Sequence, residues 1–355
     1  MTTTDRSRRA SVLPDFIDTH VIVLFFAAVA VFAALGFARP DIFLSAQNLQ
    51  SMLLQISVIG LLSLAVALTL LTGGIDLSIN AVANLASIVA ASFLSASVGS
   101  NLGLPPELLA VFALVVGLVV GLLCGLFNGF LIAVLGYSPI LATLGTMTLF
   151  IGFGTVITGG STLFGIASLA NIGRGAFLGI PFPAIVFVLI ALGLAAMLHG
   201  RRLGFNLYLY GANPTAARYS GINTRKLLLI VYAISGALSG LAGIVNLSVT
   251  NSANVDFGSS YVLLAILVSV LGGISPLGGV GKILGVIFSV IILQLLSTGL
   301  NLILQASGSN FLRDFAWGLT LILVLAIGRV QFGSLQKLFS RHSGTVEKGE
   351  ANGKG

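Results

Sequence analysis

Long runs of sequence without a single charged side chain constrain this chain more than any other feature. The longest run covers residues 108–173, and similar runs fill most of the sequence between residues 19 and 328. A helix that crosses the hydrocarbon core of a membrane needs about 20 consecutive apolar residues. Only 8% of the 355 residues are charged, whereas soluble domains average about 25%. We therefore expect an integral membrane protein rather than a soluble domain, and a hydrophobic content of 57% excludes a disordered chain.

The uncharged runs divide into about ten transmembrane helices. The segment from Gly136 to Pro139 interrupts the longest run, because Gly and Pro are the strongest breakers of local structure. The sequence lacks the alternation of polar and apolar residues that is typical of membrane β-barrels. We expect an all-α integral membrane protein with one transmembrane domain over residues 19–329, between cytoplasmic tails at 1–18 and 330–355. The expected helices cover residues 19–38, 52–72, 77–99, 108–135, 139–158, 181–198, 226–248, 260–273, 282–304 and 311–329.

The basic residues give the expected orientation in the membrane. If the N-terminus is cytoplasmic and there are ten helices, 14 of the 17 Lys and Arg residues lie on the cytoplasmic side. Only Arg39, Arg174 and Arg313 lie elsewhere. Such an excess of basic residues in cytoplasmic loops is typical of multi-pass membrane proteins. We therefore expect both termini in the cytoplasm, and the net charge of +7 is better explained by this pattern than by nucleic-acid binding.

One cytoplasmic loop, residues 199–226, has the sequence of a short capped helix. Asn213 suits the N-cap position, Pro214 suits the first helical position, and Gly221 suits the left-handed position after the helix. A helix of two turns is not stable alone, so it must pack on its own membrane domain or on a partner. The small face of Ala216 and Ala217 favours docking to a partner, although a plain connecting helix is the alternative. The residues expected in this contact are Asn213, Pro214, Ala216, Ala217, Arg218, Tyr219, Ser220 and Gly221.

Glycines recur at four-residue spacing in the expected helix over residues 108–135. Glycine lets two helix backbones approach closely in membranes. We favour packing within this chain over a dimer contact for this set, and likewise for a second set in the helix over 226–248. The two sets are Gly117, Gly121, Gly125 and Gly129, and Gly236, Gly240 and Gly243.

The eighth expected helix is unusually short. Its apolar core runs only from Tyr261 to Leu271 and is followed by Gly272 and Gly273. Eleven residues span about 16 Å, roughly half of the hydrocarbon core. Short spans interrupted by Gly and Pro indicate transport pathways, although a simple cytoplasmic turn is the alternative here.

Several polar residues are candidates for the pathway. Asp76 either caps the third helix together with Ser78 or acts in a gate. Uncharged polar side chains suit a neutral, hydroxyl-rich solute, or they hydrogen-bond neighbouring helices. The candidates for the pathway or its gate are Gln55, Gly73, Gly74, Asp76, Asn84, Asn128, Thr143, Gly272 and Gly273.

Four kinds of chemistry have no support in the sequence. The spans lack the series of Asp, Glu and His residues that a proton-driven carrier needs. The same scarcity argues against an enzyme active site within the membrane. A phosphate-binding GxxxxGK[ST] motif is absent, so we expect no ATP site of that type. A single cysteine also excludes a metal site built on cysteines, and we expect no catalytic or metal-binding residue.

Four sequence blocks carry a resemblance to a known family. The first block is Leu71–Ser78, and the second joins Gly125–Gly129 to Thr143–Thr146. The third runs from Tyr210 to Ile222, and the fourth is Leu271–Gly281. Together they resemble the permease subunits of bacterial ABC sugar importers of the ribose, xylose and arabinose type (carbohydrate uptake family 2), and the third block resembles the coupling loop of these permeases.

This resemblance implies a fold like that of type II ABC importers and a role in sugar import by alternating access. It implies four kinds of contact: a cytoplasmic ATPase subunit docked on residues 212–221, a periplasmic solute-binding protein, a second permease chain, and the lipid of the bacterial inner membrane. The permease itself would carry no cofactor, because ATP and Mg would be bound by the ATPase partner.

A weak internal similarity accompanies the resemblance. Gly125-Leu126-Phe127-Asn128 near the end of the fourth helix is similar to Gly299-Leu300-Asn301 near the end of the ninth. Those two helices run in opposite directions in the expected topology. An inverted repeat of helices 2–5 and 7–10 would account for this similarity.

One departure from the family and two alternatives stay open at this point. Relatives commonly carry acidic residues after the tyrosine at the start of the eighth helix, whereas Tyr261 is followed here by Val262, Leu263 and Leu264. Any solute preference that depends on those acids does not transfer to this chain. The nearest alternative function is a permease for branched-chain amino acids, and a self-sufficient secondary carrier is a more distant one.

Overall fold

The computed structural model describes residues 19–94, 105–165 and 167–304, together with residues 315, 317–319 and 322. The described residues up to 304 belong to one compact unit, and those from 315 onward belong to a second. Both expected tails and most of the expected tenth helix lie outside the described residues, although residues 315, 317–319 and 322 are helical. All the labelled helices and strands belong to the first unit.

Seven described helices are long and apolar enough to cross a membrane, and two shorter apolar helices accompany them. Nine of the ten expected helices are thus present in the described part of the chain. The seven are α1 (Thr19–Ala38), α3 (Ala46–Leu71), α6 (Pro106–Ala133), α7 (Pro139–Thr158), α9 (Phe182–Gly200), α12 (Thr224–Thr250) and α14 (Ile283–Leu304). The shorter two are α4 (Ile79–Leu94) and α13 (Tyr261–Leu271).

The largest difference from the expected boundaries is at the start of α3. This helix begins at Ala46 instead of residue 52, because the Ser45 side chain accepts a hydrogen bond from the backbone N–H of Asn48 (3.3 Å). The cap lets polar residues form an additional first turn outside the apolar run.

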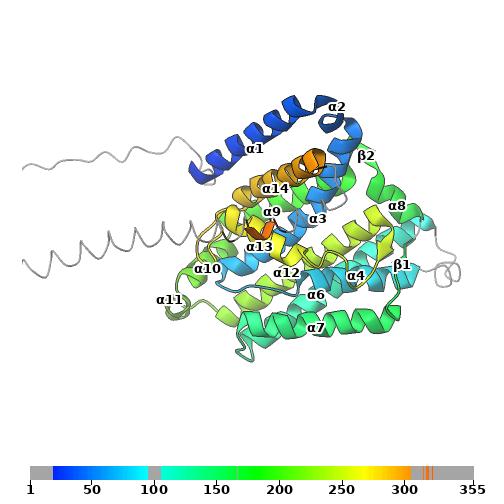
Figure 1. Cartoon of the computed structure of the whole chain (residues 1–355). Coiled ribbons are helices and arrows are strands. Elements are labelled where there is room, and N and C mark those ends of the chain that lie inside the picture. The colour runs from blue at the N-terminus through cyan, green and yellow to red at the C-terminus, as the bar shows by residue number, and fades with distance from the viewer. Residues whose placement is uncertain are drawn as a thin grey trace, which may run out of the picture. The chain divides into compact units, whose positions relative to one another are not determined.

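Short elements connect the spans. The helices among them are α2 (Pro40–Phe43), α8 (Ala167–Arg174), α10 (Arg202–Ala212) and α11 (Pro214–Tyr219). Over the described residues, the fold is all-helical apart from two small antiparallel pairs of two-residue strands: β1 (Leu163–Phe164) with β4 (Ser252–Ala253), and β2 (Ala176–Phe177) with β3 (Ile180–Pro181). These pairs lie in the connections, where the hydrophobic pattern of the spans says nothing about them. Figure 1 shows β1 and α8 at one end of the unit and α10 and α11 at the other.

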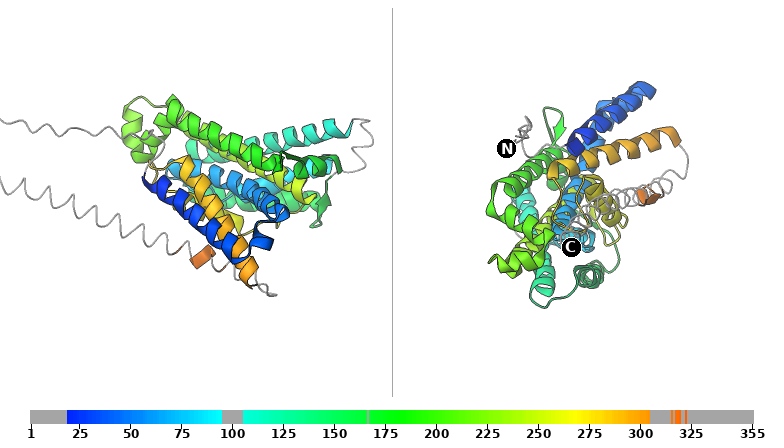
Figure 2. Two further views of the ribbon diagram at one scale, coloured as in Figure 1. Left: turned by 90° about the horizontal axis from the view of Figure 1, so that it is seen from above. Right: turned by 90° about the vertical axis from the view of Figure 1, so that its left-hand side faces the viewer.

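The helices differ in how much of their surface the protein covers. α3 and α12 are largely buried, whereas most residues of α1, α7 and α9 are not buried within the protein. Exposed apolar faces are expected where helices contact lipid, since lipid tails are as apolar as the side chains. α1 and α14 lie side by side at the edge of the unit (Figure 2).

The most extensive contact between two helices joins α6 and α12 through their glycines. A Cβ atom on Gly125 would lie 2.9 Å from the Cα of Gly236, and one on Gly121 would lie 2.8 Å from the Cα of Gly240. Gly243 makes the same kind of backbone contact with Ala83 of α4. The glycine sets therefore pack within this chain, as the sequence predicted.

Candidate functional site

The short helix α11 has the caps that its sequence predicted. The backbone N–H of Ala216 donates to the Asn213 side chain (3.0 Å), and Pro214 occupies the first helical position. At the other end, Gly221 has a φ of 80°, and its N–H donates to the carbonyl of Arg218 while the N–H of Ile222 donates to that of Ala217. This is the Schellman arrangement, which closes a helix with a left-handed glycine. The helix is therefore held by its own ends and presents a defined surface.

Of the two alanines expected to form a docking face, the structure exposes Ala216 and buries Ala217, and docking to a partner stays a prediction. Ala217 is completely buried against its own chain, whereas Ala216 and its neighbours are exposed, with Tyr219 89% exposed. A helix of six residues must bury one side to be stable, and adjacent residues point about 100° apart around the axis. The surface available to a partner therefore consists of residues 212–216 and 218–221, which include every residue expected in this contact except Ala217.

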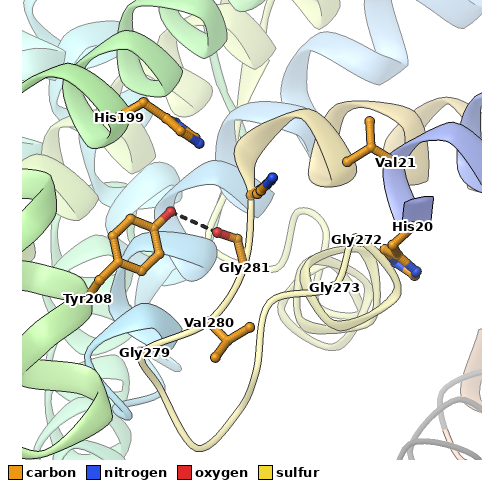
Figure 3. A pocket seen from close by; sticks show the side chains of 10 residues that line it. His20, Val21, His199, Tyr208, Gly272, Gly273, Gly279, Val280 and Gly281 are labelled. Atoms are coloured by element: carbon orange, nitrogen blue, oxygen red, sulfur yellow. Dashed lines mark hydrogen bonds between the residues drawn. The ribbon is translucent and has the colours of Figure 1, made fainter. Parts of the chain in front are cut away.

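The preceding helix α10 ties α11 to two glycine-rich loops. Gly211, near the end of α10, is in backbone contact with Leu71 at the end of α3 and with Gly279 in the loop after α13. The N–H of Gly279 also donates to the carbonyl of Leu71 (3.0 Å). The carbonyl of Gly281 in the same loop accepts a hydrogen bond from the hydroxyl of Tyr208 on α10 (2.7 Å; Figure 3). We call this meeting of α10 with residues 71–74 and 272–282 the coupling junction.

Four of the predicted pathway glycines lie at or beside the coupling junction. A Cβ on Gly73 would meet the carbonyl oxygen of Leu277 at 3.2 Å, which joins the two loops directly. Gly272 packs against Gly285 at the start of α14, and Gly273 has a φ of 87°, a conformation that other residues seldom adopt. Gly74 faces Pro139 and Tyr232 on the other side. Movement of one loop is therefore expected to displace the other.

A buried polar cluster follows Gly74 in the chain. One carboxylate oxygen of Asp76 accepts from both the N–H (2.9 Å) and the hydroxyl (2.7 Å) of Ser78, and the other accepts from Ser235 (3.4 Å). The Asn128 amide donates to the Ser78 hydroxyl (2.7 Å), and the Thr143 hydroxyl accepts from the N–H of Leu77 (3.1 Å). Side chains from α6, α7 and α12 thus hold the loop between α3 and α4 in place.

The other two predicted pathway residues lie apart from this cluster. The Asn84 amide on α4 donates to the carbonyls of Val255 and Phe257 (2.9 Å each), and so holds the segment before α13. Gln55 on α3 accepts from Gln294 of α14 (3.3 Å). The structure therefore brings Asp76, Asn128 and Thr143 together but not the whole predicted set.

Sequence reasoning missed α10 and its Tyr208. The signal was the helical spacing of Gly204, Leu207 and Gly211, which are the buried residues of this helix. The arginines and glycines around it favoured a loop instead. Burial raises the pKa of Tyr208 from 10 to about 12, so its hydroxyl remains a donor even at a pH at which an exposed tyrosine ionises.

Comparison with known proteins identifies the family. Residues 48–325 match the family described as branched-chain amino acid transport system / permease component. The chain belongs to this permease family. It is therefore a transport subunit and not an enzyme. Among the described residues of this permease, no three His, Cys, Asp or Glu side chains come together as a metal site would require.

Individual relatives of the permease match over most of their length. The ribose import permease of Bacillus subtilis strain 168 is 38% identical over 290 residues, which cover 81% of this chain and 86% of the relative. The D-allose transport permease of Escherichia coli K12 is 32% identical over 280 residues (79% and 83%). The galactose/methyl galactoside import permease of the same strain is 33% identical over 294 residues (80% and 86%).

Proposed function

We propose that this permease is the membrane subunit of an ATP-driven ABC importer that carries a sugar or sugar-like solute into the bacterial cytoplasm. The names of the relatives, which refer to ribose, allose and galactose, support this solute class. The structural observation that carries the proposal is the coupling junction, where an exposed capped helix is linked through α10 to both glycine loops. A partner that moves α11 has a direct mechanical route into the membrane domain.

Transport then proceeds by alternating access between two permease chains. A periplasmic binding protein delivers the solute to the end of the unit that carries β1 and α8. A cytoplasmic ATPase subunit, which binds ATP and Mg, docks on Ala216, Arg218, Tyr219 and their exposed neighbours in residues 212–221. Both termini face the cytoplasm, in agreement with the positive-inside pattern, and the chain lies in the inner membrane.

We further propose an inverted repeat of the type II importer kind, with α3, α4, α6 and α7 as one half and α12, α13, α14 and a tenth helix as the other. Each half begins with a long buried helix followed by a short one. The short helix of each half packs on the long helix of the other: α4 on α12, and α13 on α3. Short or interrupted helices at corresponding positions of two repeats are typical of transporters.

Branched-chain amino acids are a second candidate solute, because the description of the family itself names their transport. One experiment separates the two. Uptake of radiolabelled pentoses, hexoses, inositols and leucine is measured in a strain that lacks this gene, with and without the gene restored. We expect uptake of one sugar to be lost and restored, with leucine uptake unchanged. Loss of leucine uptake alone would overturn the sugar proposal. If neither sugar uptake nor leucine uptake is lost, both the sugar proposal and the amino-acid alternative are overturned.

A further inference from the structure

A pocket of about 440 Å³ lies where the ends of three membrane helices meet, at the end of the unit that carries α10 and α11. His20 and Val21 line it from α1, His199 from α9, and Tyr208 from α10 (Figure 3). The remaining lining comes from the loop before α14, including Val280 and Lys282. Because α1, α9 and α14 are separate spans, the pocket opens between helices at one membrane surface.

The lining of this pocket favours negative charge. Lys282 carries a positive charge at neutral pH, and the imidazole rings of His20 and His199, from two other segments, supply further nitrogen groups. Among the residues that the structure describes, no Asp or Glu lines it. The N-terminus of α14 directly follows Lys282, and a helix N-terminus contributes a further partial positive charge. A neutral sugar has no need of such a lining, whereas a phosphate group would be well matched to it.

Exposed apolar side chains lie on α1 and α9, the two membrane helices whose residues line the pocket. Val23 lies one turn beyond His20 on α1 and is 58% exposed, and Phe26 lies one turn further and is 64% exposed. On α9, Leu192 and Leu189 are exposed about two and three turns before His199. Acyl chains could therefore lie against α1 and α9 while their headgroup occupies the pocket.

We propose that this pocket binds the phosphate-bearing headgroup of an anionic phospholipid. Basic pockets between transmembrane helices at the cytoplasmic surface are suited to such headgroups. Gly272 and Gly273, two of the predicted pathway glycines, also line the pocket, and lipid binding there goes beyond the proposed import function. Through Tyr208 and the Gly279–Gly281 turn, the lipid would contact the coupling junction directly.

The test is native mass spectrometry of the purified full-length permease, titrated with dioleoylphosphatidylglycerol or with zwitterionic dioleoylphosphatidylethanolamine. We expect the anionic lipid to bind about tenfold more tightly. Lys282→Gln should weaken its binding about fivefold, the change expected for one basic residue near an anionic surface. The matched control is Lys226→Gln, which removes an exposed lysine at the start of α12 outside the pocket. It should leave the affinity unchanged.

Three outcomes would overturn the proposal. Equal affinity of the unaltered permease for the two lipids would show that the pocket does not select charge, and this measurement needs no variant to fold. An equal loss of lipid affinity in Lys226→Gln and Lys282→Gln would show that the general surface charge, and not the pocket, attracts the lipid. Complete competition by millimolar inorganic phosphate would assign the pocket to free phosphate instead of a lipid.

Discussion

Glycine serves two different purposes in two regions of this permease. Between α6 and α12, the glycines lie inside regular helices, and their missing side chains let two backbones touch along several turns. At the coupling junction, glycines occupy loops and helix ends, and Gly273 has a positive φ. The first region is a broad, continuous contact, whereas the second joins its parts through a few backbone contacts and two hydrogen bonds, Gly279 to Leu71 and Tyr208 to Gly281. We infer that the α6–α12 contact is a rigid scaffold and the coupling junction is the part that moves.

Gly121→Val should have the largest effect, because it places a branched side chain against the backbone of Gly236 and Gly240. Overpacking of this kind costs about 1–3 kcal/mol or more. We expect loss of folded protein from the membrane, measured by size-exclusion profile and thermal midpoint. Gly152→Val on α7 is the control, since a Cβ at Gly152 meets no atom within 4 Å. Equal tolerance of both substitutions would show that the glycine contact is not a scaffold.

Gly211→Ala should come next, and it should separate transport from folding. The added methyl group would collide with the carbonyl of Leu71 and with Gly279, and so push α10 away from both loops. A cost of about 1–3 kcal/mol corresponds to a fall of roughly 5-fold to 150-fold in the population of the coupled arrangement. We expect uptake to fall by that factor while ATP hydrolysis by the importer continues. Gly200→Ala, which meets no neighbour, should transport normally; a matching defect in that control would refute the assignment.

The two alanines of α11 should behave differently from each other. Ala216→Asp places a charge on the exposed surface and should reduce uptake severalfold with normal amounts of folded protein in the membrane. Ala217→Asp buries a charge in a fully enclosed site, which is strongly unfavourable, and should reduce the amount of folded protein itself. Uptake assays and membrane blots of both variants, with Ala216→Ser as the mild control, provide the measurement. Full uptake by the Ala216→Asp variant would show that the exposed surface of α11 is not part of the ATPase contact.

Tyr208→Phe should have the smallest effect. It removes one hydrogen bond, to Gly281, at a cost of about 1 kcal/mol. The raised pKa of Tyr208, about 12 against the usual 10, means that this bond is present below pH 10 and is lost as the pH rises through 12. We therefore expect a thermal midpoint that is a few degrees lower, by the same amount at pH 7 and pH 9. A difference that disappears at pH 9 would contradict this account of the hydroxyl.

The sequence was most informative where chemistry repeats with a regular spacing. Long uncharged runs located nine helices, and the cap residues Asn213, Pro214 and Gly221 gave α11 its ends. The sequence was least informative where a short element is surrounded by residues from distant parts of the chain. The burial of Ala217 and the helix α10 both depend on contacts that no local pattern encodes. Asp76 illustrates the middle case: its cap to Ser78 was predictable, whereas its contact with Ser235 joins positions 159 residues apart.

The central claim is that movement of α11 reaches the loop over residues 272–282 through α10, and the labelling of one cysteine tests it most directly. Leu277 is 83% exposed in that loop, and the native Cys124 is buried, so Leu277→Cys in a Cys124→Ser background provides a single reporter. The rate of maleimide labelling is measured in the assembled importer with and without ATP. We expect ATP to change this rate in the reporter protein but not when Gly211→Ala is added. A rate that ATP does not change, or a change that survives Gly211→Ala, would contradict the account.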